Sequence, residues 1–334
     1  MNLKNKYMNH NLPQKLGNNQ VQNGSADTSG LWAARSSALN PLYYNARITR
    51  KNPGSIIILL DQSGSMGEKY KEGKTKAEVV ADVVNDLLND IVYKCQRESN
   101  VRDYFQIMII GYGQESEEYV YSPKMSWEGK LANYDWVKVS DLKGNELDSI
   151  VTQTQEEMPW GEIIKSTTTK KVWINPIADG GTPMKAAFEL CLDKIEDWIC
   201  DNNNSYPPLI FNITDGYPSD VGNYNELTEI CDKIKAISTD HGNVLLFNCL
   251  FTSEGNMVRF PFLNQSIDFE DDYHKILFEC SSIMPNKMKQ KAYEKYGNKD
   301  FLNETPVGVI INADVRSVTD LLNIGTNTLV DNVE

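Results

Sequence analysis

One carboxylate and two hydroxyls stand at alternate positions in the segment Asp61-Gln62-Ser63-Gly64-Ser65. Oxygen ligands in a tight loop suit a hard cation such as Mg²⁺, and a glycine between the two hydroxyls lets the loop fold back. The preceding residues, 55–60, form a short apolar run rich in β-branched side chains, which predicts a strand buried on both faces of a parallel sheet. Because open α/β sheets bind their ligands at the carboxyl edge of the strands, the segment predicts a cation-binding loop.

Two further loops carry oxygen side chains at comparable places. Thr182 lies in a Gly-Gly-Thr-Pro turn, where Pro183 suits the first turn of a helix. Asp215 directly follows a predicted strand at 208–214. The carboxyl edges of neighbouring strands converge in a doubly wound sheet, so we expect these loops to meet the first one at a single point.

The three loops together resemble a known family. Asp61-x-Ser63-x-Ser65, then Thr182 in Gly-Gly-Thr and Asp215 in Thr-Asp-Gly, look like the metal-ion-dependent adhesion site of the von Willebrand factor type A domain. The order, the spacing and the strand context all agree. The C-terminal residues 308–314, and those through 323–326, are also similar to the closing strand and helix of bacterial intracellular members of that family.

The resemblance implies a role for each residue. Ser63 and Ser65 would coordinate Mg²⁺ or Mn²⁺ directly, and Thr182 would do so in the ligand-competent state. Asp61 and Asp215 would mostly hold coordinated waters and orient the serines, although Asp215 can approach the ion when Thr182 withdraws. Asp179, next to the same turn, is expected to be a turn or capping residue.

Neutral hydroxyl ligands leave the charge of the ion poorly neutralised, so the ion attracts an anionic oxygen from outside. An Asp or Glu side chain of another protein would complete the octahedron that Mg²⁺ prefers. We therefore expect a non-catalytic, divalent-cation-dependent protein-interaction module. The family analogy adds a scaffold role in a bacterial stress-response or signalling system.

The main alternative is a Mg²⁺-dependent phosphate-ester hydrolase with Asp61 as nucleophile. Phosphatases of the haloacid-dehalogenase type place a second Asp two residues further on as general acid, where this chain has Ser63. The segment Gly73-Lys74-Thr75 resembles the end of a phosphate-binding loop, but the glycine required five residues earlier is Glu68. A third possibility is a degenerate site with a purely structural role. The histidines are not expected beside a nucleophile: His10, His241 and His274.

Composition excludes several classes of function. The net charge of −13 over 334 residues, without a basic block, argues against binding to nucleic acid or to anionic membranes. The lysine-rich segment 69–76 is interrupted by glutamate and is expected to be a solvated loop and helix start. Gln62 and Met66 are likewise expected to face solvent. Six widely spaced cysteines are expected to be buried free thiols. Because the sequence shows no apolar leader and no span of membrane length, we expect a cytoplasmic protein. The sequence does not indicate its oligomeric state.

The pattern of elements predicts an α/β fold of three layers, with a doubly wound, mostly parallel sheet and a β-rich insertion. Strands are expected at 55–61, 104–112, 208–214, 244–251 and 307–311, alternating with helices at 75–95, 183–200, 224–238, 271–281 and 314–323. We expect a flexible lead at 1–30, a domain at 31–325 with its insertion at about 123–171, and a C-terminal tail at 326–334. The aromatic residues of the insertion could form a small satellite core, which we favour, or a partner-binding surface: Tyr119, Tyr121, Trp127, Tyr134, Trp136, Trp160 and Trp173.

Overall fold

The computed structural model describes residues 43–70, 73–113, 122–157, 163–252 and 255–334. The predicted lead at 1–30 lies outside the described residues, as do Tyr119, Tyr121 and Trp160. No helix in the described part of the chain is both long and apolar enough to cross a bilayer.

Parallel strands form the centre of a mixed sheet in the spatial order β14-β12-β9-β1-β4. The chain builds this sheet outward in two directions, because β4 adds to one side of β1 and β9, β12 and β14 add successively to the other. The expected doubly wound, mostly parallel arrangement is therefore confirmed, and the order of the strands reverses between β1 and β9. The bounds are β1 Gly54–Asp61, β4 Phe105–Tyr112, β9 Leu209–Thr214, β12 Leu245–Phe251 and β14 Val309–Ala313.

Very short antiparallel strands close both edges of this sheet. On one side β5 (Lys124–Met125) and β6 (Val137–Lys138) both pair with β4, and on the other side β13 (Val258–Arg259) pairs with β14. Edge strands of this length leave little unpaired backbone to other chains. Two small hairpins, each made of two-residue strands, lie in the connections between the larger elements: β2 Gln96–Arg97 with β3 Asn100–Val101, and β10 Ser238–Thr239 with β11 Gly242–Asn243.

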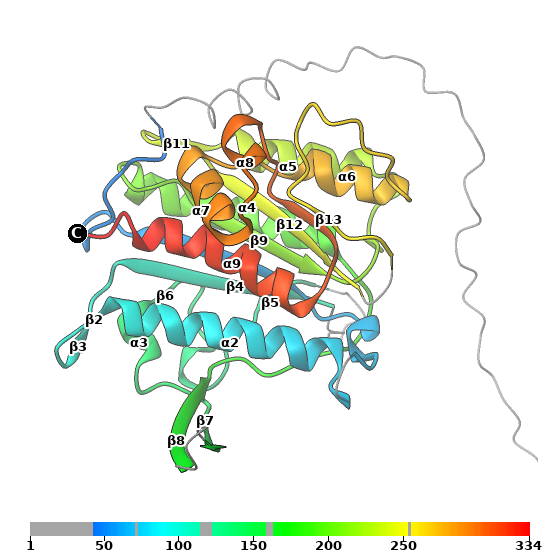
Figure 1. Ribbon diagram of the computed structural model, residues 1–334. Helices are drawn as coiled ribbons and strands as arrows, with labels where there is room; N and C mark the ends of the chain where they lie inside the picture. Colours follow the sequence, from blue (N-terminus) through cyan, green and yellow to red (C-terminus); the bar gives the residue numbers. More distant parts are fainter. Residues whose placement is uncertain (1–42, 71–72, 114–121, 158–162, 253–254) are drawn as a thin grey trace, which may run out of the picture.

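Helices cover both faces of the sheet, which explains why the central strands are apolar throughout (Figure 1). All eight residues of β1 are buried. Ile56, Ile58 and Leu60 face the core shared with α2 and α9, whereas Ile57 and Leu59 face the core shared with α4, α5 and α6. A strand covered on both faces needs no polar side chain along its length. The helix bounds are α2 Lys76–Cys95, α3 Val139–Leu142, α4 Met184–Asn202, α5 Asn225–Ala236, α6 Asp272–Cys280, α7 Asn286–Tyr296, α8 Asp300–Asn303 and α9 Val315–Val330, with short 3₁₀ turns η1 Gly64–Gly67 and η3 Gly129–Leu131.

The closing helix is longer than the expected 314–323. α9 continues to Val330, so much of the expected tail at 326–334 packs against the sheet. Thr326 and Thr328 are buried there because their hydroxyls donate 2.8 Å hydrogen bonds to the carbonyl groups four residues earlier. Such back-bonding hides polar residues on an apolar face, which is why the periodic pattern ends too early in the sequence.

The insertion divides into two parts. Its first part packs on the main core, where Trp127, Leu131 and Val137 are buried, and Trp173 at its end belongs to the same core. The favoured satellite core is therefore wrong for both tryptophans. Tyr134 is 54% exposed, as a partner-binding surface would require.

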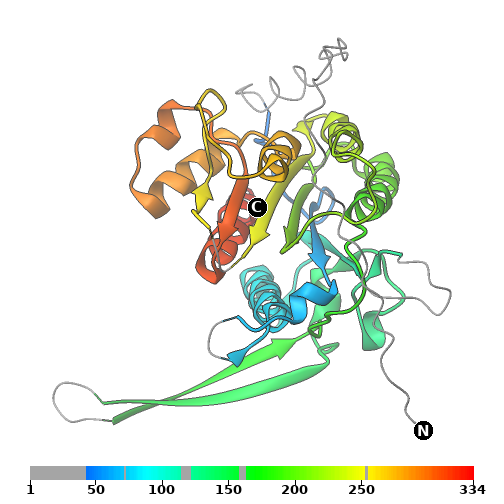
Figure 2. The same ribbon diagram turned by 90° about the vertical axis from the view of Figure 1, so that its right-hand side faces the viewer.

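The second part of the insertion is a long two-stranded arm. β7 (Asp148–Glu157) and β8 (Ile163–Val172) pair over ten antiparallel positions and project away from the body (Figure 2). In the described part of the chain no third strand pairs with the arm. At its base Asn85 of α2 binds the backbone of Trp173 and Ile174 with its side-chain amide.

Cys200 alone among the six cysteines is exposed, so the expectation of buried free thiols holds for the other five.

Candidate metal centre

Asp61 is fixed at the end of β1 by hydrogen bonds to both of its carboxylate oxygens. The register of β1 against β9 places Leu60 opposite Ile213, so the next residues, Asp61 and Thr214, end neighbouring strands. The hydroxyl of Thr214 donates to Oδ2 of Asp61 at 2.6 Å, and the backbone N–H of Ser63 donates to Oδ1 at 2.9 Å. The carboxyl group is thus held in one orientation at the point where the strand order reverses.

Burial dominates the electrostatics of this carboxyl group. Asp61 is 2% exposed, and loss of hydration raises its pKa from 3.8 to about 6. The hydrogen bonds from Ser63 and Thr214 act in the opposite direction, and the negative charge of Asp215 adds a smaller upward contribution. A cation at this position would offset the unfavourable burial of the charged form.

The two serine hydroxyls lie side by side. Ser63 Oγ is 3.1 Å from Ser65 Oγ, and the Ser65 hydroxyl donates to Oδ1 of Asp215 at 2.7 Å. Neighbouring ligands in an octahedral Mg²⁺ site, each about 2.1 Å from the ion, are separated by about 3 Å. The hydroxyl pair therefore has the spacing that two adjacent ligands of such an ion require.

Backbone hydrogen bonds bring the second loop to this position. Gly64 N–H donates to the carbonyl of Gly180 at 3.0 Å, and Asp179 N–H donates to the carbonyl of Gln62 at 2.7 Å. Thr182 is buried, and the Ser219 hydroxyl accepts a 2.9 Å hydrogen bond from its backbone N–H. The structure thus brings the three predicted loops together, with Asp179 itself exposed and engaged through its backbone.

The sequence reasoning missed a cation that is already present. Lys76, the first residue of α2, places its Nζ 2.9 Å from Oδ2 of Asp215 and 2.7 Å from Oε2 of Glu68. The segment 69–76 was expected to be solvated, yet Lys76 is 8% exposed. Burial acts to lower the pKa of Lys76, but its hydrogen bonds to Glu68 and Asp215 outweigh burial and raise it. Thr214 was also missed, since a threonine at the end of a strand carries no signal of its contact.

Gln62 and Met66, expected to face solvent, are buried. Gln62 is 4% exposed and its side-chain amide donates to the hydroxyl of Ser126, while Met66 is 1% exposed in the core beneath α2. Both side chains therefore pack inside the protein under the loop at residues 61–66 and are not available to a partner.

The chemistry of the donor set fits a hard divalent cation. In the described part of the chain no three His, Cys, Asp or Glu side chains gather closely enough to hold a metal. The candidate centre instead combines the carboxylates of Asp61 and Asp215 with the hydroxyls of Ser63 and Ser65, and Thr182 lies on the adjoining loop. Oxygen donors select Mg²⁺ or Mn²⁺ over softer ions. The Lys76 ammonium, which already stands against Asp215, shows that this carboxylate accepts a positive charge.

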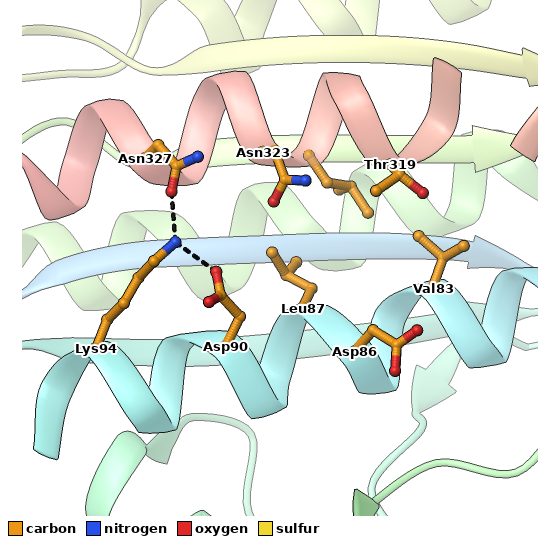
Figure 3. A pocket seen from close by; sticks show the side chains of 9 residues that line it. Val83, Asp86, Leu87, Asp90, Lys94, Thr319, Asn323 and Asn327 are labelled. Atoms are coloured by element: carbon orange, nitrogen blue, oxygen red, sulfur yellow. Dashed lines mark hydrogen bonds and ion pairs between the residues drawn. The ribbon is translucent and has the colours of Figure 1, made fainter. Parts of the chain in front are cut away.

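A cavity of about 570 Å³ opens beside the centre at the ends of β9, β12 and β14. Glu68, Lys76 and Asp215 line it together with Glu270 and His274. A side chain from another molecule could therefore approach the centre from this direction, although the side chain of Asp215 itself has no exposed surface. A second hollow, of about 390 Å³, lies between α2 and α9, where Lys94 contacts Asp90 and Asn327 (Figure 3). It contains none of the predicted site residues.

No protein-family model matches the chain, and no curated protein matches it. Several solved structures resemble it. Three of them are manganese-loaded TRAP protein from Plasmodium vivax (14% identity, 84% of this chain and 74% of that one, TM-score 0.38), the pilus adhesin SpaC from Lactobacillus rhamnosus GG (13%, 86% and 32%, 0.45) and proximal thread matrix protein 1 from the mussel byssus (13%, 84% and 47%, 0.40). At such identities and TM-scores these similarities assign neither a family nor a function.

Proposed function

We propose that this chain is a von Willebrand factor A-type interaction module that binds Mg²⁺ or Mn²⁺ through Ser63, Ser65 and Thr182, with Asp61 and Asp215 orienting the site. The observation that carries the proposal is the 3.1 Å separation of the two serine hydroxyls beside two buried carboxylates, at the reversal point of the sheet. The bound ion would supply an electrophilic position for an acidic side chain of another protein.

The surroundings of Asp61 support a non-catalytic role. Both of its oxygens accept hydrogen bonds, from Ser63 and Thr214, and the side chain is buried. A nucleophilic carboxylate must present an oxygen to its substrate, and Asp61 is only 2% exposed. In the described part of the chain no observation favours the alternative of a phosphate-ester hydrolase.

The decisive experiment is calorimetric titration of the full chain with MgCl₂ and with MnCl₂, for the wild type and for Ser63→Ala/Ser65→Ala. We expect wild-type binding, at least about tenfold weaker binding in the double variant, and an unchanged circular dichroism spectrum. Absence of binding in the wild type at millimolar metal would leave only a structural role for the site. Metal-dependent turnover of p-nitrophenyl phosphate, abolished by Asp61→Asn, would establish the hydrolase instead.

The partner is proposed to be a protein that supplies an Asp or Glu side chain. Capture on immobilised wild-type chain, compared with Ser63→Ala/Ser65→Ala and with buffer containing EDTA, isolates partners that need the metal. The assignment to a bacterial, cytoplasmic stress-response or signalling scaffold rests on the family resemblance alone. Identification of the captured proteins tests it.

A further inference from the structure

Asp215 is fully engaged before any external cation arrives. Its side chain has no exposed surface, its Oδ1 accepts from the Ser65 hydroxyl, and its Oδ2 lies 2.9 Å from the Lys76 ammonium. A metal ion that draws on Asp215 and Ser65 must therefore compete with a positive charge that belongs to the chain itself.

The position of Lys76 is fixed by the backbone around it. Thr75 caps α2 with a reciprocal capping box to Glu78, so the helix begins at Lys76. The backbone N–H of Lys76 donates to the carbonyl of Glu68 at 3.0 Å, and its ammonium contacts the carboxylate of the same residue at 2.7 Å. Lys76 and Glu68 therefore close a short loop through one backbone contact and one side-chain contact, and the ammonium of Lys76 reaches Asp215 from this loop.

Glu68 is a second carboxylate partner of the Lys76 ammonium. Its side chain is 66% exposed, whereas that of Asp215 is fully buried. Lys76 can therefore keep one carboxylate partner, in contact with water, when the other is taken by a metal. An exposed carboxylate holds the displaced charge at little energetic cost.

We propose that Lys76 is an internal counter-cation of the centre, which occupies Asp215 in the metal-free state and thereby lowers the affinity of the site for divalent cations. The inference deepens the proposed function and rests on it. The physical reason is direct repulsion, since a unit charge so close to a divalent ion acts strongly in a partly buried site. The centre then fills only when the metal concentration suffices to displace the Lys76 ammonium from Asp215, while its contact with Glu68 remains.

Lys74 provides a matched control on the same loop. It carries the same charge, its side chain is 54% exposed, and its ammonium pairs with Asp82 at 2.6 Å. Substitution of Lys74 removes one positive charge two residues from Lys76 without touching the contact to Asp215. A difference between the two variants therefore measures the direct contact and not the net charge of the chain.

The test is a titration of the metal-free full chain with MnCl₂. Binding is measured by calorimetry or from the electron paramagnetic resonance signal of free Mn²⁺. Wild type, Lys76→Met and Lys74→Met are compared, and Lys76→Gln is added in case the apolar side chain prevents folding. We expect Lys76→Met and Lys76→Gln to lower the dissociation constant about tenfold or more, and Lys74→Met to change it by less than about twofold. Thermal unfolding in EDTA verifies that each variant is folded.

The possible outcomes separate this inference from the proposed function. If the wild type binds Mn²⁺ and both Lys76 variants bind it equally or more weakly, the counter-cation role is wrong and the metal site stands. A change in Lys74→Met as large as that in Lys76→Met would also overturn it. If only the Lys76 variants bind, Lys76 blocks the site in the wild type, so the inference is supported and the metal-binding function proposed for the wild-type chain fails. If no variant binds at millimolar Mn²⁺, the metal site and the inference both fail.

Discussion

The hydroxyl of Thr214 and Oδ2 of Asp61, which end neighbouring parallel strands, are joined by a 2.6 Å hydrogen bond. The same hydroxyl lies within hydrogen-bonding distance of the backbone of Gly216. Thr214 therefore links the first of the three loops to the third, although the resemblance, which includes it in Thr-Asp-Gly, assigns it no role.

Substitution of Thr214 tests this link. Thr214→Val keeps the shape but leaves a buried oxygen of Asp61 without its donor, so we expect a loss of about 1–3 kcal/mol in the free energy of unfolding. Urea denaturation in EDTA measures this loss. Thr214→Ser, which retains the hydroxyl, should lose clearly less. Equal losses in both variants would show that packing of the methyl group is what matters.

The raised pKa of Asp61 predicts a pH dependence of stability in the metal-free protein. The folded-state pKa of about 6 exceeds the ordinary 3.8, so the folded chain binds this proton more tightly than the unfolded chain does. The stabilising contribution is complete below pH 3.8, is lost as the pH rises towards 6, and amounts to about 3 kcal/mol. Asp61→Asn cannot titrate, so in EDTA its stability relative to wild type should rise between pH 4.5 and 6 and then stay level. A constant difference over this range would contradict the assignment.

Asp220 is expected to influence the candidate metal centre through the first turn of α4. Its carboxylate accepts hydrogen bonds from the backbone N–H groups of Lys185 and Ala186, in the first turn of α4. Asp220→Ala should cost about 1–2 kcal/mol of stability, and it should weaken Mn²⁺ binding because Thr182 lies just before this turn. Asp220→Asn keeps an acceptor and should be closer to wild type in both measurements. Unchanged Mn²⁺ affinity in the alanine variant would separate the helix cap from the site.

The arm is expected to be dispensable for the fold. Replacement of residues 149–171 by a short glycine-containing turn removes ion pairs of Lys170 with Asp82 and Asp86, which are partly exposed. Such pairs contribute about 0–1 kcal/mol each, so the unfolding midpoint in urea should change little. Asn85→Ala, which removes the anchor at the base, should cost about 1–3 kcal/mol because buried backbone groups lose their partners. If arm removal is the more destabilising of the two, the arm belongs to the folding core.

The sequence predicts the sheet and the meeting of the loops because both depend on local signals. Apolar β-branched runs mark β1 and β9, Asp61 and Asp215 stand directly after these runs, and Ser63 follows two residues after Asp61. Lys76 could not be predicted, since a lysine at a helix start points to solvent in most sequences and only the folded loop returns it to Asp215. Trp127 was misplaced for a related reason, because a segment without periodicity does not reveal which core receives its side chains.

The pairing of β1 with β9 has a thermodynamic consequence. Ser65 and Asp215 are 150 positions apart in the chain and meet only after these strands have aligned. A partly folded chain thus lacks the centre, and a metal ion that binds there binds the native state alone. Ligand linkage then adds about 2.7 kcal/mol of stability when the metal is present at a hundred times its dissociation constant. If the proposed metal site is correct, bound metal would therefore measure how much of the chain has completed the long-range assembly of its sheet.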